Sequence, residues 1–492
     1  GDKPCNVRKD LCRWLNYRKE PKLGSNENLR MGEHVKENYL FQEGVSESVL
    51  KSTTLFFDRM VQRYLPDAFL FAVLLTVIVY ISGIVFAGSS PLEMVQYWGE
   101  GFWDLLAFAM QMALIVVTGY ILANAPAIKS LLSHLARQAR TPGQAVVLVT
   151  VVSTVACLIN YGFGLVVGAL IARHVIRVVP EADYRLLVAG AYSGFLVWHG
   201  GLSGSVPLTI ATADHFLEDA IGIVPISETL LSGYNLFIVV ALLVTLPLLN
   251  RLLLKSTDSG GRIAPLLDDE LAAAAEPVTE TSVRGAQTPA DRLENSVVVS
   301  VVIGLLGLVF IVFHFVQNGV DLNINIVNFT FLFLGILLHK TPRRFLNCVA
   351  DGVKNAGGII IQFPFYAGIM GMMVASGLSE QLSLWFVSIS NDVTFPFFTF
   401  LSAGIVNFFI PSGGGQWAVQ GPIMVQAGAE LGVDTAKTAM AVAWGDAWTN
   451  MIQPFWALPL LAIAGLKVRD IMGFCVMALL WSFVVIAVGF FA

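Results

Sequence analysis

The stretch from Asn407 to Pro422 is the part of the sequence best suited to holding a small anion. It places three glycines directly behind Pro411 and Ser412, between two strongly apolar segments. Proline has no amide donor and glycine costs about 1 kcal/mol relative to alanine, so we expect the helix to break here. A helix that restarts behind such a break presents unpaired amides and about half a positive charge, which suits a carboxylate.

Similar breaks are predicted at Asn160-Tyr-Gly-Phe-Gly164 and between Trp198 and Ser205. Broken backbone within a membrane persists only where protein buries it or where it lines a wet cavity, so we expect the breaks to converge on one site. The alternative is that the glycines serve only close helix packing. The predicted substrate-binding residues are Asn160, Gly162, Gly164, Ser203, Asn407, Ser412, Gly413, Gly414 and Gly415.

Asp446 is the only carboxylate deep inside an apolar segment of the second half of the chain. An unpaired charge there costs about 2.5 to 3.5 kcal/mol, so it should be paired, protonated or bound to a metal ion. With Thr449 and Asn450 it would take a proton or hold sodium. His199, at the corresponding break in the first half, is the other predicted coupling residue. The alternative is that Asp446 is a hydrogen-bonded strut and His199 is simply hydrogen-bonded.

The composition predicts a polytopic membrane protein. Of 492 residues, 55% are apolar and 13% are charged, and the mean hydropathy is +0.70. Soluble domains have roughly a quarter of charged residues. The net charge of -5 comes with no basic face for a nucleic acid, and the five cysteines form no CxxC pair. We therefore expect neither a disulfide framework nor a cofactor.

The predicted fold is all-α, with nine crossings and two re-entrant hairpins. Residues 1–64 form a polar tail, and 253–293 a flexible linker. Residues 65–252 and 320–492 form two membrane repeats, joined by a connecting span within 294–319. The hairpins are 143–180 and 395–430, the broken spans are 184–208 and 438–464, and the other spans are 67–88, 102–124, 233–252, 296–316, 322–339, 356–377 and 471–491.

The two repeats are predicted to have opposite orientations. Pro91 and Gln111 recur 251 residues later as Pro342 and Gln362. Two arginines follow Pro342, whereas the loop around Pro91 has neither lysine nor arginine. Because cytoplasmic loops retain these cations, we expect a cytoplasmic N-terminus and inverted repeats. Inverted repeats with broken helices are typical of secondary transporters with alternating access.

Several segments resemble the bacterial short-chain fatty acid transporter family, over about 85% of the chain and excluding its first 50 residues. These segments are Gly99 to Leu114, Asn160 to Ala169, Gln362 to Gly368, Pro411 to Gly415 and Gln453 to Pro459. The resemblance implies cation-coupled uptake of short monocarboxylates, such as acetoacetate and butyrate, across the bacterial inner membrane. It also implies an elevator-like motion of the hairpins and broken spans against spans 67–124 and 296–377. The coupling ion, proton or sodium, and a homodimer remain open.

Two alternatives compete with this function. A sodium-coupled di- or tricarboxylate carrier would share the fold but would need more cationic or hydroxyl groups for its extra carboxylates. An intramembrane serine protease would use Gly201-Leu-Ser-Gly204 and a histidine base on a neighbouring helix. The later histidines, His314 and His339, fall near span ends, and a protease leaves the inverted repeat unexplained.

Overall fold

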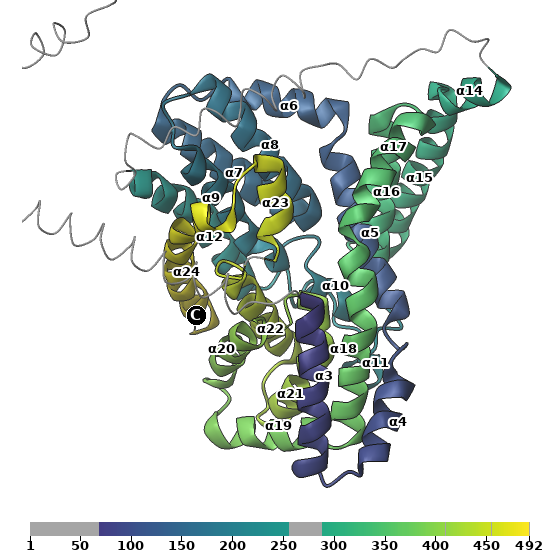
Figure 1. The fold of residues 1–492 in the computed structure, drawn as a ribbon, viewed down its shortest axis with the longest axis vertical. Helices are drawn as coiled ribbons and strands as arrows, with labels where there is room; N and C mark the ends of the chain where they lie inside the picture. Colours follow the sequence, from purple (N-terminus) through teal and green to yellow (C-terminus); the bar gives the residue numbers. More distant parts are fainter. Residues whose placement is uncertain (1–67, 255–287, 409, 454, 492) are drawn as a thin grey trace, which may run out of the picture. The chain divides into compact units, whose positions relative to one another are not determined.

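A computed structural model describes residues 68–254, 288–408, 410–453 and 455–491, and every regular element among them is helical (Figure 1). This confirms the predicted all-α class for the described residues. Seven of their helices are long and apolar enough to cross a membrane, so the chain is a multi-pass membrane protein. These are α5 (Leu106–Ala123), α7 (Pro142–Ile159), α8 (Tyr161–Val178), α12 (Gly233–Leu253), α15 (Val297–Asn318), α18 (Gly357–Ala375) and α24 (Val468–Phe491).

Several helices begin with a hydroxyl residue followed by proline. Ser90, Thr141, Thr288 and Thr341 each accept a hydrogen bond from the backbone amide three residues later. The hydroxyl satisfies an amide that the first helical turn leaves unpaired, and proline suits the first helical position. These caps start α4 (Pro91–Gly101), α7, α14 (Pro289–Glu294) and α17 (Pro342–Gly352).

The order of helices recurs along the chain. The first half contains α3 (Ala68–Val85), α4, α5, α6 (Pro126–Ala136), α7, α8, α9 (Tyr184–Ser193), the 3-10 helix η1 (Gly194–Gly200), α10 (Ser205–Ile210), α11 (Glu218–Ile221) and α12. The second contains α16 (Ile324–His339), α17, η3 (Val353–Asn355), α18, α19 (Leu378–Ile389), α20 (Phe395–Val406), α21 (Gly413–Glu430), α22 (Thr435–Thr449), α23 (Ala457–Ala464) and α24.

Corresponding helices have nearly constant spacing in the two halves. The first residues of α4 and α17 lie 251 positions apart, and those of α8 and α21 lie 252 apart. Both members of the first pair have 11 residues, and both members of the second have 18. The short helices α4, α6, α17 and α19 had no place in the predicted span list, because each is only 11 or 12 residues long.

The segments predicted as hairpins differ from each other. A single residue, Asn160, separates α7 from α8, and each of these helices has 18 residues, about 27 Å at 1.5 Å per residue. The segment 395–430 consists of α20, with 12 residues, and the longer α21. The predicted tail (1–64) and residues 255–287 of the predicted linker lie outside the described residues. Residues 289–293 of that linker belong to α14, which ends at Glu294.

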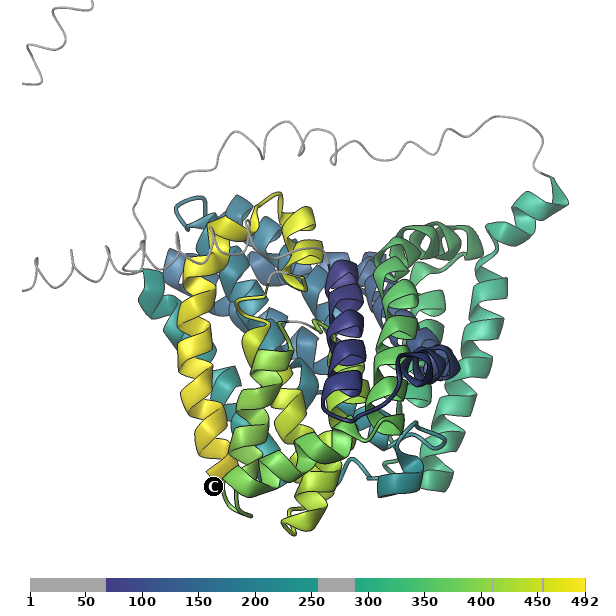
Figure 2. The ribbon, with the colours of Figure 1, turned by 60° about the horizontal axis from the view of Figure 1, so that its bottom comes forward.

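The helices α7 to α9 and α20 to α22 form the densely packed part of the described unit. Helix α7 packs on α8, α20 packs on α22, and α24 lies beside α9 and α12 (Figure 2). Among the contacts that join these helices to the others, α5 packs on α8 and α18 packs on α21. Large aromatic side chains fill this part, and Trp198, Trp417 and Trp444 are completely or almost completely buried.

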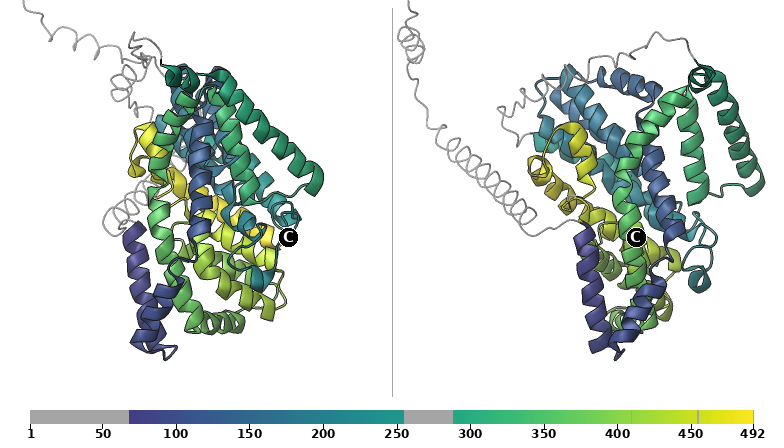
Figure 3. Two further views of the ribbon diagram at one scale, coloured as in Figure 1. Left: turned by 90° about the vertical axis from the view of Figure 1, so that its right-hand side faces the viewer. Right: turned by 45° about the vertical axis from the view of Figure 1, so that its right-hand side comes forward.

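Helix α15 lies at the edge of the unit and packs mainly on α16 (Figure 3). Only 17% of the most apolar stretch of this helix is buried within the protein. Val298, Val309 and Val316 on this helix are each more than half exposed. Such a surface is stable in lipid, as expected for the connecting span.

Candidate functional site

The break at Asn160 is held together by the protein itself. Asn160 has an extended backbone, and its side-chain oxygen accepts a hydrogen bond from the amide of Phe163 at 2.8 Å. The Ser203 hydroxyl oxygen accepts a hydrogen bond from the amide of Tyr161 at 2.9 Å. The amide of Gly164 donates to the Asn160 carbonyl at 2.8 Å. Few donors of the first turn of α8 therefore remain for a ligand.

The two glycines of this break allow helices to approach closely. A Cβ on Gly164 would lie 2.3 Å from Sγ of Cys157, and one on Gly162 would lie 3.1 Å from Cα of Val116. Real Cβ atoms do not approach other atoms as closely as the first of these distances. Both glycines contribute to packing between α8 and its neighbours.

The break between α20 and α21 leaves two amides without a partner among the described residues. It covers residues 407–412, and the three glycines form the first turn of α21 rather than the break itself. Ser412 caps this helix, because its hydroxyl accepts a hydrogen bond from the amide of Gly415 at 3.3 Å. The amides of Gly413 and Gly414 donate to no atom of the described residues. A helix N-terminus with two free amides is a ready anion-binding site.

A small cavity lies at this N-terminus. Its volume is ≈10 Å³, which is about the size of one water molecule and too small for any carboxylate. Three buried donors on residues that line it, the Ser205 hydroxyl and the indole N–H groups of Trp198 and Trp456, have no hydrogen-bond partner among the described residues. The lining residues are Met112, Tyr161, Trp198, Ser205, Ile359, Phe363, Ser412, Gly413, Gly414 and Trp456.

Side chains press against all three glycines of the α21 terminus. A Cβ on Gly413 would lie 2.3 Å from Nε2 of His199, and one on Gly414 would lie 2.6 Å from Cζ of Phe108. A Cβ on Gly415 would lie 2.6 Å from Cδ2 of Tyr366 on α18. Only glycine allows these approaches, so the terminus meets η1, α5 and α18 at one place.

His199 and Asp446 lie next to this terminus and contact each other. Nε2 of His199 is 3.2 Å from Oδ2 of Asp446, and both side chains are completely buried. The side-chain nitrogen of Asn450 donates to the same carboxylate oxygen at 3.0 Å. The side-chain nitrogen of Asn407 donates to the Asp446 backbone carbonyl, the Thr449 hydroxyl and the Asn450 side-chain oxygen at 3.0, 3.0 and 3.2 Å.

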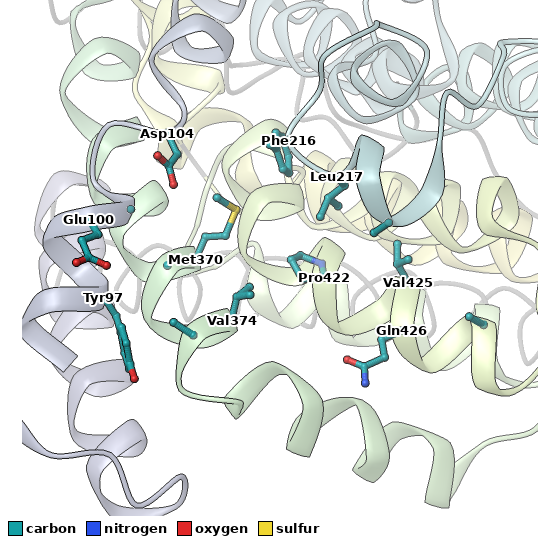
Figure 4. Close-up of a pocket in the computed structure, with 15 residues that line it drawn as sticks. Tyr97, Glu100, Asp104, Phe216, Leu217, Met370, Val374, Pro422, Val425 and Gln426 are labelled. Carbon is teal, nitrogen blue, oxygen red and sulfur yellow. The ribbon is translucent and has the colours of Figure 1, made fainter. Parts of the chain in front are cut away.

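A larger pocket of ≈710 Å³ lies apart from the predicted residues (Figure 4). Glu100 and Asp104, at and just beyond the end of α4, lie on one side, and Pro422 and Gln426 of α21 lie on the other. Phe216 in its wall contacts Phe108, with 5.5 Å between ring centroids. Phe108 also lies against Gly414, so it connects this wall of the pocket to the α21 terminus.

The structure thus brings the predicted residues into three groups. Ser412, Gly413 and Gly414 line the small cavity, whereas Gly415 faces α18. His199, Asn407, Asp446, Thr449 and Asn450 form one polar network. Asn160, Gly162, Gly164 and Ser203 hold the break before α8.

Sequence reasoning missed part of the cavity lining. Ser205, Tyr161 and Phe363 face the cavity from three different helices. A hydroxyl directly after a predicted break, as at Ser205, was a usable signal. No described group of three or more His, Cys, Asp or Glu side chains could hold a metal ion.

Comparison with known proteins identifies relatives of the whole membrane part. The model of the short chain fatty acid transporter family matches residues 49–492. A protein of Escherichia coli (strain K12), described as "Putative short-chain fatty acid transporter", is 47% identical over 434 residues, covering 88% of this chain and 98% of the relative. A protein of Haemophilus influenzae with the same description is 43% identical over 450 residues, covering 90% of this chain and 100% of the relative.

Two solved structures share the fold at low sequence identity. The YdaH transporter of Alcanivorax borkumensis matches with a TM-score of 0.52 and 15% identity, over 86% of this chain and 98% of YdaH. MtrF of Neisseria gonorrhoeae, described among antimetabolite efflux pumps, matches with a TM-score of 0.50 and 13% identity, over 89% and 97%. Both likenesses concern the fold alone. The family match and the close relatives show that this chain belongs to the short-chain fatty acid transporter family, whose members are membrane transporters and not enzymes.

Proposed function

We propose that this protein is a secondary active transporter that moves short monocarboxylates, such as acetoacetate and butyrate, across the bacterial inner membrane by cation-coupled symport. The observation that carries the proposal is the open N-terminus of α21. Its two free amides at Gly413 and Gly414 face a cavity with three unpartnered buried donors. The descriptions of the relatives from Escherichia coli and Haemophilus influenzae support the substrate class.

The chemistry of the cavity wall favours a short acid with one carboxylate. Met112, Ile359 and Phe363 offer an apolar surface for a short acyl chain. Hydrogen-bond donors gather around one helix end, and no lysine or arginine of the described residues is buried. A second carboxylate would find no cation there. These features speak against a di- or tricarboxylate substrate.

Alternating access is the mechanism we infer, because the cavity of ≈10 Å³ is too small for a carboxylate and must widen to load one. The recurring helix order at a spacing of 251–252 residues supports two repeats, and the distribution of lysine and arginine supports their inversion. The hairpin helices and broken spans would move as an elevator against α3 to α5 and α15 to α18. Contacts of α5 with α8 and of α18 with α21 would then be remade during transport.

The large pocket marks the approach to the site from outside the cell. It lies beside the end of α4 and beside residues 216–220, whose loops contain no lysine or arginine. Such loops are typical of the external side, which supports a cytoplasmic N-terminus. Phe108 would have to move for a substrate to pass from this pocket to α21.

Counterflow into proteoliposomes tests the proposed function. Vesicles with the full chain are loaded with unlabelled acetoacetate, and the entry of labelled acetoacetate, butyrate or succinate is followed. Short acids cross lipid slowly in their neutral form, so the flux into protein-free vesicles is subtracted. We expect saturable exchange of the two monocarboxylates and none of succinate. Equal exchange of succinate would favour the dicarboxylate carrier, and no exchange of any acid would refute the proposal.

A variant at the α21 terminus tests where the substrate binds. Gly414→Val would place a branched side chain against Phe108, whose Cζ already lies 2.6 Å from the position of a Cβ. Exchange should be abolished while the protein still reaches the membrane. Normal exchange by this variant would show that the terminus is not part of the site.

A further inference from the structure

The pair of His199 and Asp446 retains unused hydrogen-bonding capacity. Each contributes one atom to the contact at 3.2 Å, and the other atoms, Nδ1 of His199 and Oδ1 of Asp446, have no partner among the described residues. The pair joins η1 of the first half to α22 of the second half across 247 residues of sequence. An imidazole beside a carboxylate can take up and release a proton near neutral pH.

The charge balance of the site requires a positive partner for an incoming carboxylate. A carboxylate on the free amides of Gly413 and Gly414 would lie against His199, because Nε2 is 2.3 Å from the position of a Cβ on Gly413. If Asp446 were ionised and His199 neutral, two negative charges would share the site. The helix N-terminus offsets only about half a charge. No described lysine or arginine is buried to offset the rest.

Three of the oxygens that could hold a sodium ion at this break already accept hydrogen bonds from Asn407, whereas Oδ1 of Asp446 and Oδ1 of Asn407 have no partner among the described residues. The carbonyl of Asp446, the hydroxyl of Thr449 and the side-chain oxygen of Asn450 all surround the Asn407 amide nitrogen within 3.2 Å. The hydroxyl of Thr449 donates its own hydrogen to the Gly404 carbonyl, so its oxygen is free to accept. The three acceptors fix the Asn407 amide with its nitrogen inward. An NH₂ group therefore fills the position of a cation.

The other groups near the pair leave its charge unchanged around neutral pH. The titratable side chains near this region, on helices packed against η1 or α22, are Tyr161 on α8, Tyr192 on α9, Cys157 on α7 and Cys475 on α24. Phenols and thiols are ordinarily uncharged at pH 7. Helices α10 and α12 present Ser205 and Asn235, which are not ionisable.

We propose that His199 and Asp446 together carry the proton that crosses with each carboxylate, so that the transporter is coupled to protons and not to sodium. This inference rests on the proposed function. The proton makes the pair neutral when a carboxylate occupies the terminus of α21. Proton and carboxylate then leave together when the site opens to the other side, and the symport is electroneutral.

Linkage between proton and substrate binding gives a direct test in detergent solution. If one proton is taken up with each acetoacetate, its Kd must rise about tenfold per pH unit once the free pair has lost its proton. We expect this slope for the full chain by calorimetry between pH 6 and 9, roughly, with no change when sodium replaces potassium. A Kd independent of pH, or a Kd lowered by sodium, would overturn the proposal.

Two variants locate the proton. Asp446→Asn and His199→Gln keep similar shapes, and we expect both to bind acetoacetate with a Kd that no longer depends on pH. The matched control is His314→Gln, because His314 lies 3.5 Å from Asp321 in a second His–Asp pair near the end of α15. This control should keep the slope of the unchanged protein. An unaltered slope in Asp446→Asn would place the proton elsewhere.

Infrared titration of the substrate-free protein separates failure of this proposal from failure of the proposed function. A protonated carboxyl absorbs apart from a carboxylate, so a carboxyl band that titrates and disappears in Asp446→Asn would show that Asp446 takes part in proton binding. If no short acid binds, the proposed function fails, and this band still decides whether the pair is a proton site. Absence of any band that depends on Asp446 or His199 would overturn the proposal.

Discussion

Gly413→Ala tests the closest approach in the site. The new Cβ would lie 2.3 Å from Nε2 and 2.6 Å from Cε1 of His199, and 2.8 Å from Oγ of Ser205. All three atoms belong to side chains that are at least 99% buried, so they have little room to move. Overpacking a buried site typically costs about 1 to 3 kcal/mol, which corresponds to a roughly 5- to 150-fold loss of binding or transport.

The expected loss is large enough to outweigh the usual benefit of alanine. Replacing glycine by alanine where the backbone permits it stabilises a protein by about 0.4 to 1 kcal/mol. Gly357→Ala at the start of α18 is a matched control, because no atom lies within 4 Å of its new Cβ. We expect this control to keep full exchange and an equal or slightly higher Tm.

The assay measures initial rates of acetoacetate counterflow, normalised to the amount of protein in the vesicles, together with Tm. Gly413→Ala should insert normally and lose exchange by about one order of magnitude or more, in line with the cost given above. Exchange at the rate of the unchanged protein, with unchanged Tm, would refute the reasoning, because the terminus of α21 could then not lie against His199.

Three further perturbations have definite expectations. Asn407→Ala removes three hydrogen bonds and should lower stability by about 2 to 3 kcal/mol, seen as a lower Tm, without creating sodium dependence. Deletion of residues 1–50 should leave counterflow intact, and its loss in a correctly inserted protein would show that the tail contributes to transport. Acidification should loosen α14. Hydrogen bonds from Thr288 hold the pKa of Asp291 below its usual value. The stabilisation of α14 by ionised Asp291 is therefore present above the usual pKa and is lost as the pH falls through the lowered pKa. Amide exchange at α14 should therefore accelerate below about pH 4.

Local signals in the sequence located the breaks but not their roles. The breaks between α7 and α8 and between α20 and α21 lie close to the expected positions, although the glycines that marked them fall in the first turns of α8 and α21. The glycines nevertheless act differently, since Gly164 packs on Cys157 while Gly413 and Gly414 leave open amides beside a cavity. Sequence shows where a helix stops. Whether the amide donors of the next helix stay free depends on distant partners. Ser203, for example, accepts a hydrogen bond from the amide of Tyr161, 42 residues away in the sequence.

Long-range pairs were beyond the reach of pattern analysis for the same reason. The burial cost of a lone carboxylate marked Asp446, and the position of His199 at a corresponding break marked the histidine. Their contact at 3.2 Å depends on how η1 packs against α22. No periodicity in the sequence predicts that packing. The predicted shift of 251 or 252 residues equals the spacing between the first residues of helix pairs such as α8 and α21.

A site without a buried lysine or arginine suits a carrier that must also return empty. A buried arginine would bind a carboxylate well, but after release it would remain as an uncompensated charge inside the moving part. The N-terminus of α21 offers partial charges that belong to neutral peptide groups, so no ion is stranded when the substrate leaves. With a proton on His199 and Asp446 in the loaded state, one negative charge crosses with the substrate. With the pair deprotonated, one negative charge also remains in the empty state, so loaded and empty forms meet similar electrostatic barriers.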